Sequence, residues 1–259
     1  MSLVETDWLE KNLDNIKIID CSWHMPQTKR NGLEEFKNHH IPNAIFFDLD
    51  NNSKKNTNLP HMLVDINDWE KIVSKMGIKK NDEIVVYDNS DVISSCRCWF
   101  NFIYFGHDPK LVHVLNGGLK KWIREKRKVT HYVSNLKISE YKSIEKNELV
   151  KNKNFIDQNI DKQVFKVIDA RSKERFEGKV PEPRKGLRSG SIKNSFCIPF
   201  NHCLNEDNTF KKREELIRVF KTCLENINEK NIVFSCGSGV TACVLALAYS
   251  LINDKYHPC

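Results

Sequence analysis

The chain has 259 residues, about twice the length of an ordinary domain, which favours two domains. Hydrophobic residues make up 40% and charged residues 29%, and there are only 10 Gly and 8 Pro, so disordered, fibrous and low-complexity classes are excluded. The net charge of +7 comes from lysines scattered along the chain, so we expect no nucleic-acid partner.

The first residues, the apolar runs and the cysteines indicate the cellular compartment in which the protein resides. The first eleven residues show no secretory signal, and the longest apolar run, Val244 to Ile252, is far shorter than the ~20 residues that span a bilayer. The nine cysteines are odd in number and irregularly spaced, which argues against a disulfide framework. Cys96 and Cys98 do not match a metal-ligand spacing and are predicted as small buried side chains. We therefore expect a cytoplasmic protein with no membrane contact, no metal and no cofactor.

Short β-branched runs alternate with longer amphipathic stretches, which indicates βαβ units, a parallel sheet and an α/β fold. In the first half, the pattern predicts strands at Lys17–Asp20, Ala44–Phe47, Ile84–Tyr87 and Val112–Leu115, and helices at Asp65–Met76, Ser94–Phe105 and Leu119–Lys126. The polar stretch from Thr130 to Glu148 separates this half from the next.

The second half repeats the first at an offset of about 149 residues. Three pairs of segments match in the same order: Ile18-Ile19-Asp20 with Val167-Ile168-Asp169, Ile41 to Ala44 with Ile192 to Ser195, and Glu83 to Asp88 with Asn231 to Cys236. Duplication predicts domains at residues 1–138 and 151–259, joined by a linker at 139–150. The second copy ends where its last strand and helix are expected, so we expect it to lack both.

The strongest chemical signal is the loop at residues 236–240. A buried strand ends just before Cys236, the loop contains Gly237 and Gly239, and an apolar helical run follows. Backbone N–H groups in such a loop converge on one centre, and the helix N-terminus adds positive potential. A cysteine at its mouth is stabilised as a thiolate, and an anion on its sulfur is held by the same groups.

A cysteine loop of this kind also occurs in phosphatases, but these need an arginine six positions after the cysteine to hold a phosphoryl group. That position is Ala242 here, and the loop is short for phosphate. The loop therefore favours sulfur transfer, with a persulfide carried on Cys236.

The segment Cys236-Gly237-Ser238-Gly239-Val240-Thr241-Ala242 resembles the active-site loop of the 3-mercaptopyruvate sulfurtransferases, a branch of the two-domain rhodanese superfamily. Further segments across the chain resemble family blocks: Ile19 to Trp23, His40 to Asp48, Val114 to Gly118, Asp169 to Phe176 and Glu182 to Gly190. The resemblance implies two tandem rhodanese-like domains and transfer of sulfur from 3-mercaptopyruvate to a thiol or cyanide acceptor, with thioredoxin as one candidate.

The same resemblance implies roles for individual residues. Cys236 carries the persulfide, and the loop residues Gly237, Gly239, Val240 and Thr241 surround the substrate. Arg175 and Arg184 match the two arginines that hold the carboxylate and keto groups, for which a planar guanidinium suits an α-keto acid better than lysine. Ser238, His61 and Asp50 match a proton relay drawn from both domains. Asp88 stands at the position of Cys236 in the first copy, which predicts a non-catalytic domain.

Two alternatives remain open. The first is a thiosulfate sulfurtransferase, although such enzymes carry cations directly after the cysteine, where this chain has Gly237 and Ser238. The second is a non-enzymatic sulfur-binding protein with a rhodanese-like fold, suggested by the short second copy. Measuring persulfide formation with both donors separates the three interpretations.

Overall fold

In the computed structural model, which describes residues 2–256 and 258, the chain divides into two compact units. The first unit comprises Met1–Lys146 and Glu206–Thr209, and the second comprises Asn147–Asn205 and Phe210–Cys259. The first unit extends beyond the boundary predicted at residue 138 because Tyr141 is fully buried within it, where its hydroxyl lies 2.9 Å from His107 Nδ1.

The first unit is built on a parallel sheet of five strands in the order β1-β5-β4-β2-β3. Its strands are β1 (Leu3–Val4), β2 (Lys17–Asp20), β3 (Ala44–Phe46), β4 (Ile84–Tyr87) and β5 (Val112–Leu115). The four strands predicted in this half are therefore present, and β1 is an addition of two residues that the β-branched pattern was too short to reveal.

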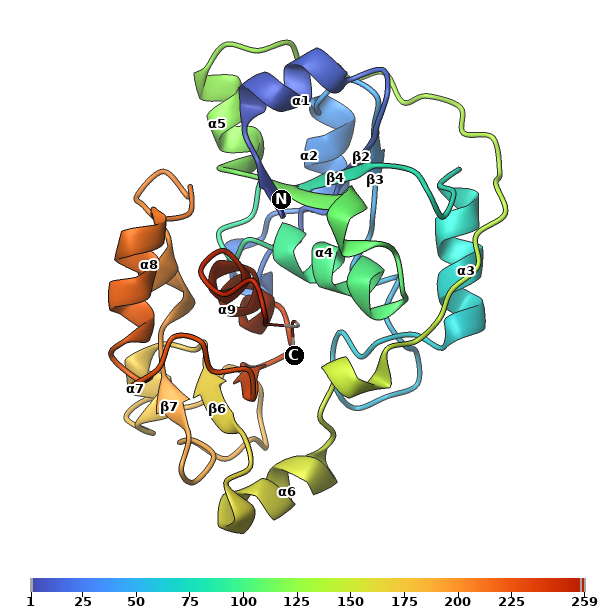
Figure 1. Ribbon diagram of the computed structural model, residues 1–259. Coiled ribbons are helices and arrows are strands. Elements are labelled where there is room, and N and C mark those ends of the chain that lie inside the picture. The colour runs from blue at the N-terminus through green and yellow to red at the C-terminus, as the bar shows by residue number, and fades with distance from the viewer. Residues whose placement is uncertain (1, 257, 259) are drawn as a thin grey trace. The chain divides into compact units, whose positions relative to one another are not determined.

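Helices cover both faces of this sheet (Figure 1). On one face lie α1 (Thr6–Asn12), α2 (Gly32–Asn38) and α5 (Gly118–Arg124), and on the other lie α3 (Ile66–Lys75) and α4 (Ser95–Tyr104). The three predicted helices match α3, α4 and α5 to within one or two residues at each end. Fraying and 3₁₀ turns at helix ends explain differences of this size.

Each face of the sheet has its own core. Ile18, Val85 and Tyr87 point from the strands toward Trp122 of α5 on one face. On the other face, Trp69 of α3 stacks on Phe105 with ring centroids 4.6 Å apart and meets Phe102 of α4 edge-on at 5.1 Å. Cys96 and Cys98 of α4 are buried, as predicted for small apolar side chains.

The second unit has a smaller parallel sheet in the order β7-β6-β8. Its elements are α6 (Lys153–Lys162), β6 (Lys166–Asp169), α7 (Lys173–Phe176), β7 (Phe196–Cys197), α8 (Arg213–Phe220), β8 (Ile232–Ser235) and α9 (Thr241–Ser250). Phe220 of α8, Phe234 of β8 and Tyr249 of α9 meet in one aromatic cluster, with centroids 5.0 to 6.1 Å apart.

The two sheets match strand for strand where both exist. Lys17 pairs with Ile84 in the first, and Lys166 pairs with Ile232 in the second, at the offsets of 149 and 148 read from the sequence. The order β3-β2-β4 corresponds to β7-β6-β8. Within the described residues, the second sheet has no counterpart of β5.

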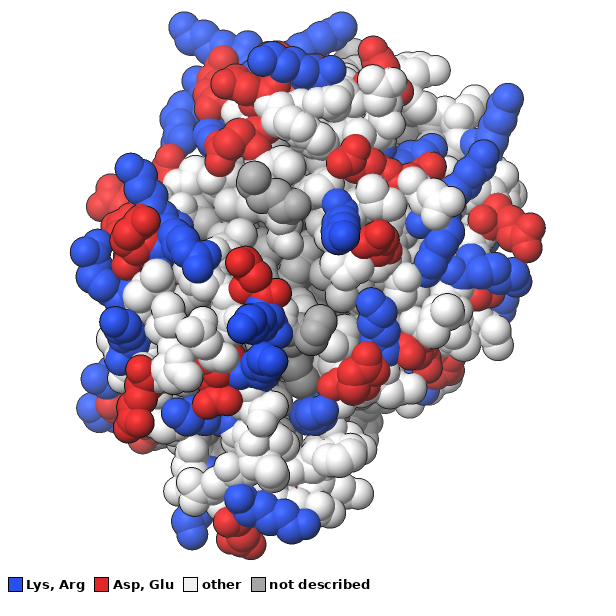
Figure 2. Space-filling model, in the orientation of Figure 1, with Lys and Arg blue, Asp and Glu red and all other residues white. Residues whose placement is uncertain are grey.

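No helix among the described residues is both long and apolar enough to cross a membrane. On the face drawn in Figure 2, lysine and arginine side chains alternate with acidic ones, consistent with the scattered charge of the sequence. The eight cysteines that the structure describes are all free, and Cys259 lies outside the described residues.

Asp20 makes the stability of the first unit depend on pH. Its carboxyl is buried at the end of β2, accepts hydrogen bonds from the backbone N–H and the hydroxyl of Ser22, and has its pKa raised by burial from 3.8 to about 6. Between these pH values the folded state binds more protons than the unfolded state, so the unfolding free energy falls as pH rises, by about 3 kcal/mol in total.

Between pH 4 and pH 7, the unfolding free energy of wild type should fall by about 3 kcal/mol because Asp20 ionises. We expect Asp20→Asn to lack this fall. Urea unfolding followed by tryptophan fluorescence measures this, because all five tryptophans lie in the first unit. Asp14→Asn, at an exposed carboxylate, is the control and should keep the wild-type pH dependence. Equal pH dependence in Asp20→Asn and wild type would contradict the prediction.

Candidate active site

The loop between β8 and α9 carries the predicted nucleophile. Cys236 follows the last residue of β8 directly, and its side chain is half-buried. The backbone N–H of Gly239 donates a hydrogen bond to Cys236 Sγ at 3.1 Å. Gly239 adopts a left-handed conformation with φ of 74°, which turns this N–H back toward the sulfur and which side chains with a Cβ rarely adopt.

Helix α9 anchors the far end of the loop. Its body is almost entirely buried, because Ala242 to Tyr249 are apolar and pack within the unit. The Cys243 thiol donates to the carbonyl of Gly239 at 3.1 Å, so one residue ties the loop to the helix. The helix begins at Thr241, and its first N–H groups contribute positive potential at the end where Cys236 lies.

The two predicted substrate-binding arginines lie beside this loop. A Cβ placed on Gly237 would lie 3.3 Å from Arg175 Nη2 and 4.0 Å from Arg184 Nη2. Arg184 also donates through Nη2 to the carbonyl oxygen of Gly237. The structure thus brings Arg175 and Arg184, distant in sequence, to the residue next to Cys236.

An alternating chain of charges positions Arg175. Glu182 accepts from Arg175 Nη2 at 2.6 Å and Nε at 3.2 Å, and its other neighbour is Arg171, at 2.8 Å. Arg171 in turn forms a bidentate pair with Asp169 at the end of β6. The hydrogen bond from Arg175, and then the charges of both arginines, hold the pKa of Glu182 below its ordinary value although its side chain is only 4% exposed.

No pattern in the sequence assigns a role to Glu182, Arg171 or Asp169. Acidic and basic residues alternate in the segments Asp169 to Phe176 and Glu182 to Gly190, and this alternation is the sequence feature that could have indicated the ion pairs. Because a bidentate pair fixes the plane of a guanidinium, Glu182 determines which edge of Arg175 faces the loop.

In the corresponding loop of the first unit, the side chain of Asp88 occupies the backbone N–H groups. Asp88, at the position of Cys236, accepts hydrogen bonds from the backbone N–H groups of Ser90 at 2.7 Å and Ser95 at 2.8 Å. Burial raises the pKa of Asp88. The amides that could cradle an anion are therefore occupied by a carboxylate of the chain, which supports the prediction of a non-catalytic loop.

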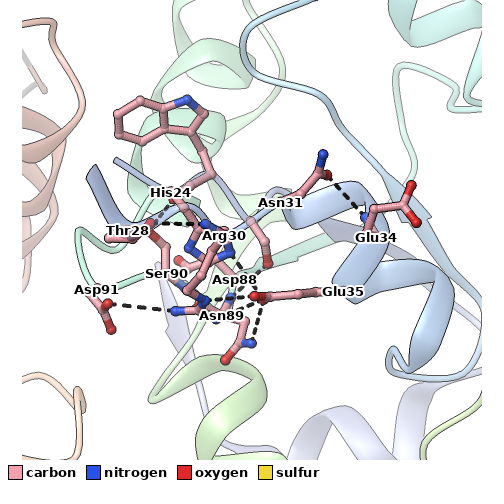
Figure 3. Close-up of polar contacts among 12 residues, drawn as sticks. His24, Thr28, Arg30, Asn31, Glu34, Glu35, Asp88, Asn89, Ser90 and Asp91 are labelled. Atoms are coloured by element: carbon pink, nitrogen blue, oxygen red, sulfur yellow. Dashed lines mark hydrogen bonds and ion pairs between the residues drawn. The ribbon is translucent and has the colours of Figure 1, made fainter. Parts of the chain in front are cut away.

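An arginine and a glutamate flank this loop as well (Figure 3). Arg30 donates to the carbonyl oxygen of Asn89 at 3.1 Å, as Arg184 does to Gly237 in the other unit. Glu35 binds Arg30 through both oxygens, at 2.7 and 2.8 Å. The duplicated units thus share an arginine clamp on the second residue of the loop, although one has lost the cysteine.

His61 and Asp50 form a close pair in the first unit. His61 Nε2 lies 2.8 Å from Asp50 Oδ1, and Trp23 donates to the same oxygen at 3.0 Å. The hydrogen bond to His61 is the main cause that lowers the pKa of Asp50. His61 Nδ1 is buried and has no hydrogen-bond partner among the described residues. With a proton on Nε2 donated to Asp50, Nδ1 keeps a free lone pair and is able to accept a proton.

The arrangement defines what the site is able to do. A half-buried thiol lies in a loop whose amide points at the sulfur, with two guanidinium groups beside the next residue. Such a site suits nucleophilic attack by sulfur on an anionic substrate. No group of three or more His, Cys, Asp or Glu side chains placed to hold a metal ion occurs within residues 2–256 and 258.

Comparisons with known proteins agree with this geometry. A model of the rhodanese-like domain matches the chain twice, at residues 5–125 and 153–257. The chain is 41% identical to thiosulfate/3-mercaptopyruvate sulfurtransferase 1, mitochondrial, of Arabidopsis thaliana, over 95% of this chain and 70% of the plant protein. It is 34% identical to the 3-mercaptopyruvate sulfurtransferase of Mus musculus, over 99% of this chain and 88% of the mouse protein.

Among solved structures, the fold is similar to the crystal structure of SseA from Escherichia coli, described as a 3-mercaptopyruvate sulfotransferase with the rhodanese fold. The TM-score is 0.87 at 30% identity, covering 97% of this chain and 94% of that one. The chain belongs to the rhodanese family, and its two matched regions are two rhodanese-like domains in tandem. These findings confirm the fold class and the family predicted from the motifs.

We expect Gly239→Ala and Gly237→Ala to act differently. A Cβ at the left-handed Gly239 costs about 1 kcal/mol or more of stability, whereas Gly237 lacks a positive φ and its Cβ would instead press on Arg175 Nη2. Urea unfolding should therefore detect the Gly239 variant and leave the Gly237 variant close to wild type. Equal loss of stability in both variants would contradict the assigned backbone conformations.

Proposed function

We propose that this protein is a 3-mercaptopyruvate sulfurtransferase that carries the transferred sulfur as a persulfide on Cys236. The observation that carries the proposal is the convergence of Arg175 and Arg184 on Gly237, directly beside the half-buried thiol. Two guanidinium groups suit a substrate with a carboxylate and a keto oxygen. The names of the Arabidopsis and mouse relatives support the same donor.

The chemistry requires one nucleophile and one proton transfer. The Cys236 thiolate attacks the sulfur of 3-mercaptopyruvate, and the carbon–sulfur bond breaks with its electron pair leaving on carbon as the enolate of pyruvate. The enolate carbon takes up a proton, and the thiol proton of the substrate leaves the transferred sulfur. The persulfide anion on Cys236 is then stabilised by the amide of Gly239, which already donates to Cys236 Sγ.

Within the proposal, Arg175 and Arg184 hold the carboxylate and keto oxygens, and the loop residues Gly237, Gly239, Val240 and Thr241 form the wall around the sulfur. Glu182 keeps Arg175 in place through its two hydrogen bonds. The enolate carries negative charge on the former keto oxygen, so the same guanidinium groups stabilise the transition state.

Proton transfer is assigned to Ser238 of the catalytic loop and to His61 and Asp50 of the first unit. The support for His61 is its geometry: Nε2 is held by Asp50 at 2.8 Å, while the buried Nδ1 is free to accept a proton. Asp50 fixes the tautomer that leaves Nδ1 unprotonated.

The donor is proposed to be 3-mercaptopyruvate in preference to thiosulfate. The two residues after Cys236, Gly237 and Ser238, are uncharged, so the loop itself adds no cation for a compact dianion such as thiosulfate. The cations near the loop are the guanidinium groups of Arg175 and Arg184, whose planar edges suit a carboxylate and a keto oxygen. A thiosulfate sulfurtransferase is the second candidate, because the Arabidopsis relatives carry both donors in their names. The ratio of kcat/KM for the two donors decides between them, and a wild type that favours thiosulfate would overturn the choice of donor.

The acceptor is proposed to be a thiol, with thioredoxin as one candidate, and the compartment to be the cytoplasm. The support is indirect: the eight described cysteines are free, which suits a reducing compartment. Cell fractionation tests the compartment, and recovery of the protein in mitochondria would overturn it.

Cys236→Ser should abolish sulfur transfer from both donors and leave the fold intact, because a serine hydroxyl neither ionises here nor holds sulfane sulfur. Mass spectrometry after incubation with 3-mercaptopyruvate should find one added sulfur atom on Cys236 of the wild type and none on the variant. Cys223→Ser, at another partly exposed cysteine, is the control. Turnover retained in Cys236→Ser would rule out the mechanism, and a folded wild type that forms no persulfide would favour a non-enzymatic role.

Arg175→Ala and Arg184→Ala should each lower kcat/KM for 3-mercaptopyruvate by about 10- to 100-fold, the value of a charge-assisted hydrogen bond. Arg→Lys should recover only part, because lysine has no bidentate edge. Lys173→Ala, at an exposed cation of the same segment, serves as the control and should behave as wild type. If both arginine variants match the control, the carboxylate is held elsewhere.

His61→Ala should lower kcat by about 10²- to 10⁴-fold with a smaller change in KM, because a proton relay acts in the transition state. Asp50→Asn should have a weaker effect, since the amide oxygen is still able to accept from His61. Steady-state kinetics with 3-mercaptopyruvate measure both variants. An effect confined to KM would show that His61 contributes to binding and not to proton transfer.

A further inference from the structure

Trp23 contacts both members of the His61–Asp50 pair, to which proton transfer is assigned. Its indole Nε1–H donates to Asp50 Oδ1 at 3.0 Å, and the same oxygen lies 2.8 Å from His61 Nε2. Its ring also meets the His61 ring edge-on, with centroids 4.8 Å apart and planes at 83°. One side chain therefore contacts the carboxylate and the imidazole at the same time.

Asp50 needs such a support because it lies at the surface. Its side chain is 66% exposed, whereas that of His61 is only 5% exposed. A single contact to an exposed carboxylate is weak, since water competes for the oxygens and the side chain keeps its rotamer freedom. A second donor on Oδ1 holds that oxygen against His61. The hydrogen bond from His61 is the largest cause that lowers the pKa of Asp50, and the bond from Trp23 adds to it.

The backbone of Trp23 is itself anchored on both sides. Its carbonyl accepts from the Ser90 hydroxyl at 2.5 Å, and its N–H donates to Ser94 Oγ at 3.1 Å. Both serines are buried, and both lie in the segment that follows Asp88, the residue at the position of the catalytic cysteine. Because its backbone is anchored, Trp23 presents its indole N–H at a fixed place.

We propose that Trp23 is a positioning residue for proton transfer, which holds Asp50 Oδ1 in line with the Nε2–H of His61. The inference rests on the proposed function and names the residue that orients its His–Asp pair. During the reaction, His61 Nδ1 takes up a proton, and the Asp50 carboxylate stabilises the resulting imidazolium. The indole keeps its proton throughout, so Trp23 acts only through Asp50.

The same unit contains a matched arrangement that supplies a control. Trp8 meets the His113 ring edge-on with centroids 5.7 Å apart, and His113 Nε2 lies 2.9 Å from Glu83 Oε1. Trp8 and Trp23 are both partly buried. Replacing either one by Phe keeps an aromatic ring and removes one indole N–H. Trp8→Phe therefore controls for the loss of an indole beside a His–carboxylate pair.

Steady-state kinetics with 3-mercaptopyruvate test the role of Trp23. Trp23→Phe should lower kcat by about 10-fold, the value of one hydrogen bond to a charged group, and should leave KM within about 2-fold. Trp8→Phe should match wild type in both constants. An unchanged kcat in Trp23→Phe, or a change in KM alone, would overturn the proposal.

A double-mutant cycle tests whether Trp23 acts through Asp50. Asp50→Ala removes the acceptor of the indole N–H, so adding Trp23→Phe to it should cause no further loss of kcat. An equal loss of kcat in the wild-type and Asp50→Ala backgrounds would show that Trp23 affects the rate by another route. That result would also overturn the proposal.

The ring of His61 gives a measurement that needs no turnover. In protein with isotope-labelled histidine, the chemical shifts of its two ring nitrogens report which of them carries the proton. We expect the proton on Nε2 in wild type and in Trp8→Phe, and a mixture of both tautomers in Trp23→Phe. The same single tautomer in all three proteins would contradict the positioning role.

Failure of the proposed function gives a different pattern. If His61→Ala and Asp50→Ala turn over 3-mercaptopyruvate as wild type does, the relay is wrong, and the catalytic role of Trp23 is overturned with it. If those two variants lose kcat and Trp23→Phe does not, the relay stands and only the role of Trp23 is overturned.

Discussion

The pairing of β6 with β8 is the constraint on which the site depends. Asp169 is paired with Ser235 at the last position of each strand, so the two chains leave the sheet at the same height and the same edge. The segment after β6 carries Arg171, Arg175 and Arg184, and the segment after β8 begins with Cys236. A shift of two residues in this register would separate the guanidinium groups from the thiol by several ångströms, because each strand residue advances about 3.3 Å.

A series of ion pairs from Asp169 to Arg175 holds the Arg175 guanidinium beside the loop. Asp169 is fixed by the sheet, Arg171 binds it through two bonds, and Glu182 joins Arg171 to Arg175. Two carboxylates alternate with two guanidinium groups in this series, so their charges cancel. Arg175 is therefore held beside the loop without leaving an unpaired charge in the unit. Loss of Glu182 would leave two cations facing each other, which is why a buried acid is required there.

The sequence predicted the strand before Cys236 and the helix after it, but it missed the acid that orients Arg175. Buried parallel strands and an apolar helix after the cysteine were evident because the period of hydrophobic residues reports local structure. Glu182 was missed because its partners are 7 and 11 residues away and meet it only after the loop has folded. The short β1 was missed for a related reason: two residues show no period, and their pairing with β5 is set by tertiary structure.

The duplicated units show which parts of the loop belong to the fold and which to the chemistry. Both keep an arginine bound to the carbonyl of the loop's second residue and a glutamate bound in a bidentate manner to a nearby arginine. These features occur with and without a cysteine, so they stabilise the loop whatever the unit does.

The two copies differ in the group that accepts hydrogen bonds from the backbone N–H groups after the strand. In the first unit, the N–H groups of Ser90 in the loop and of Ser95 at the start of α4 bind the carboxylate of Asp88. In the second unit, the N–H of Gly239 binds the sulfur of Cys236. A carboxylate satisfies the amides permanently, but a thiol leaves them able to stabilise a charge that forms only during reaction. The first loop thus spends its amides on a carboxylate of its own chain, whereas the second leaves an amide beside a half-buried thiol.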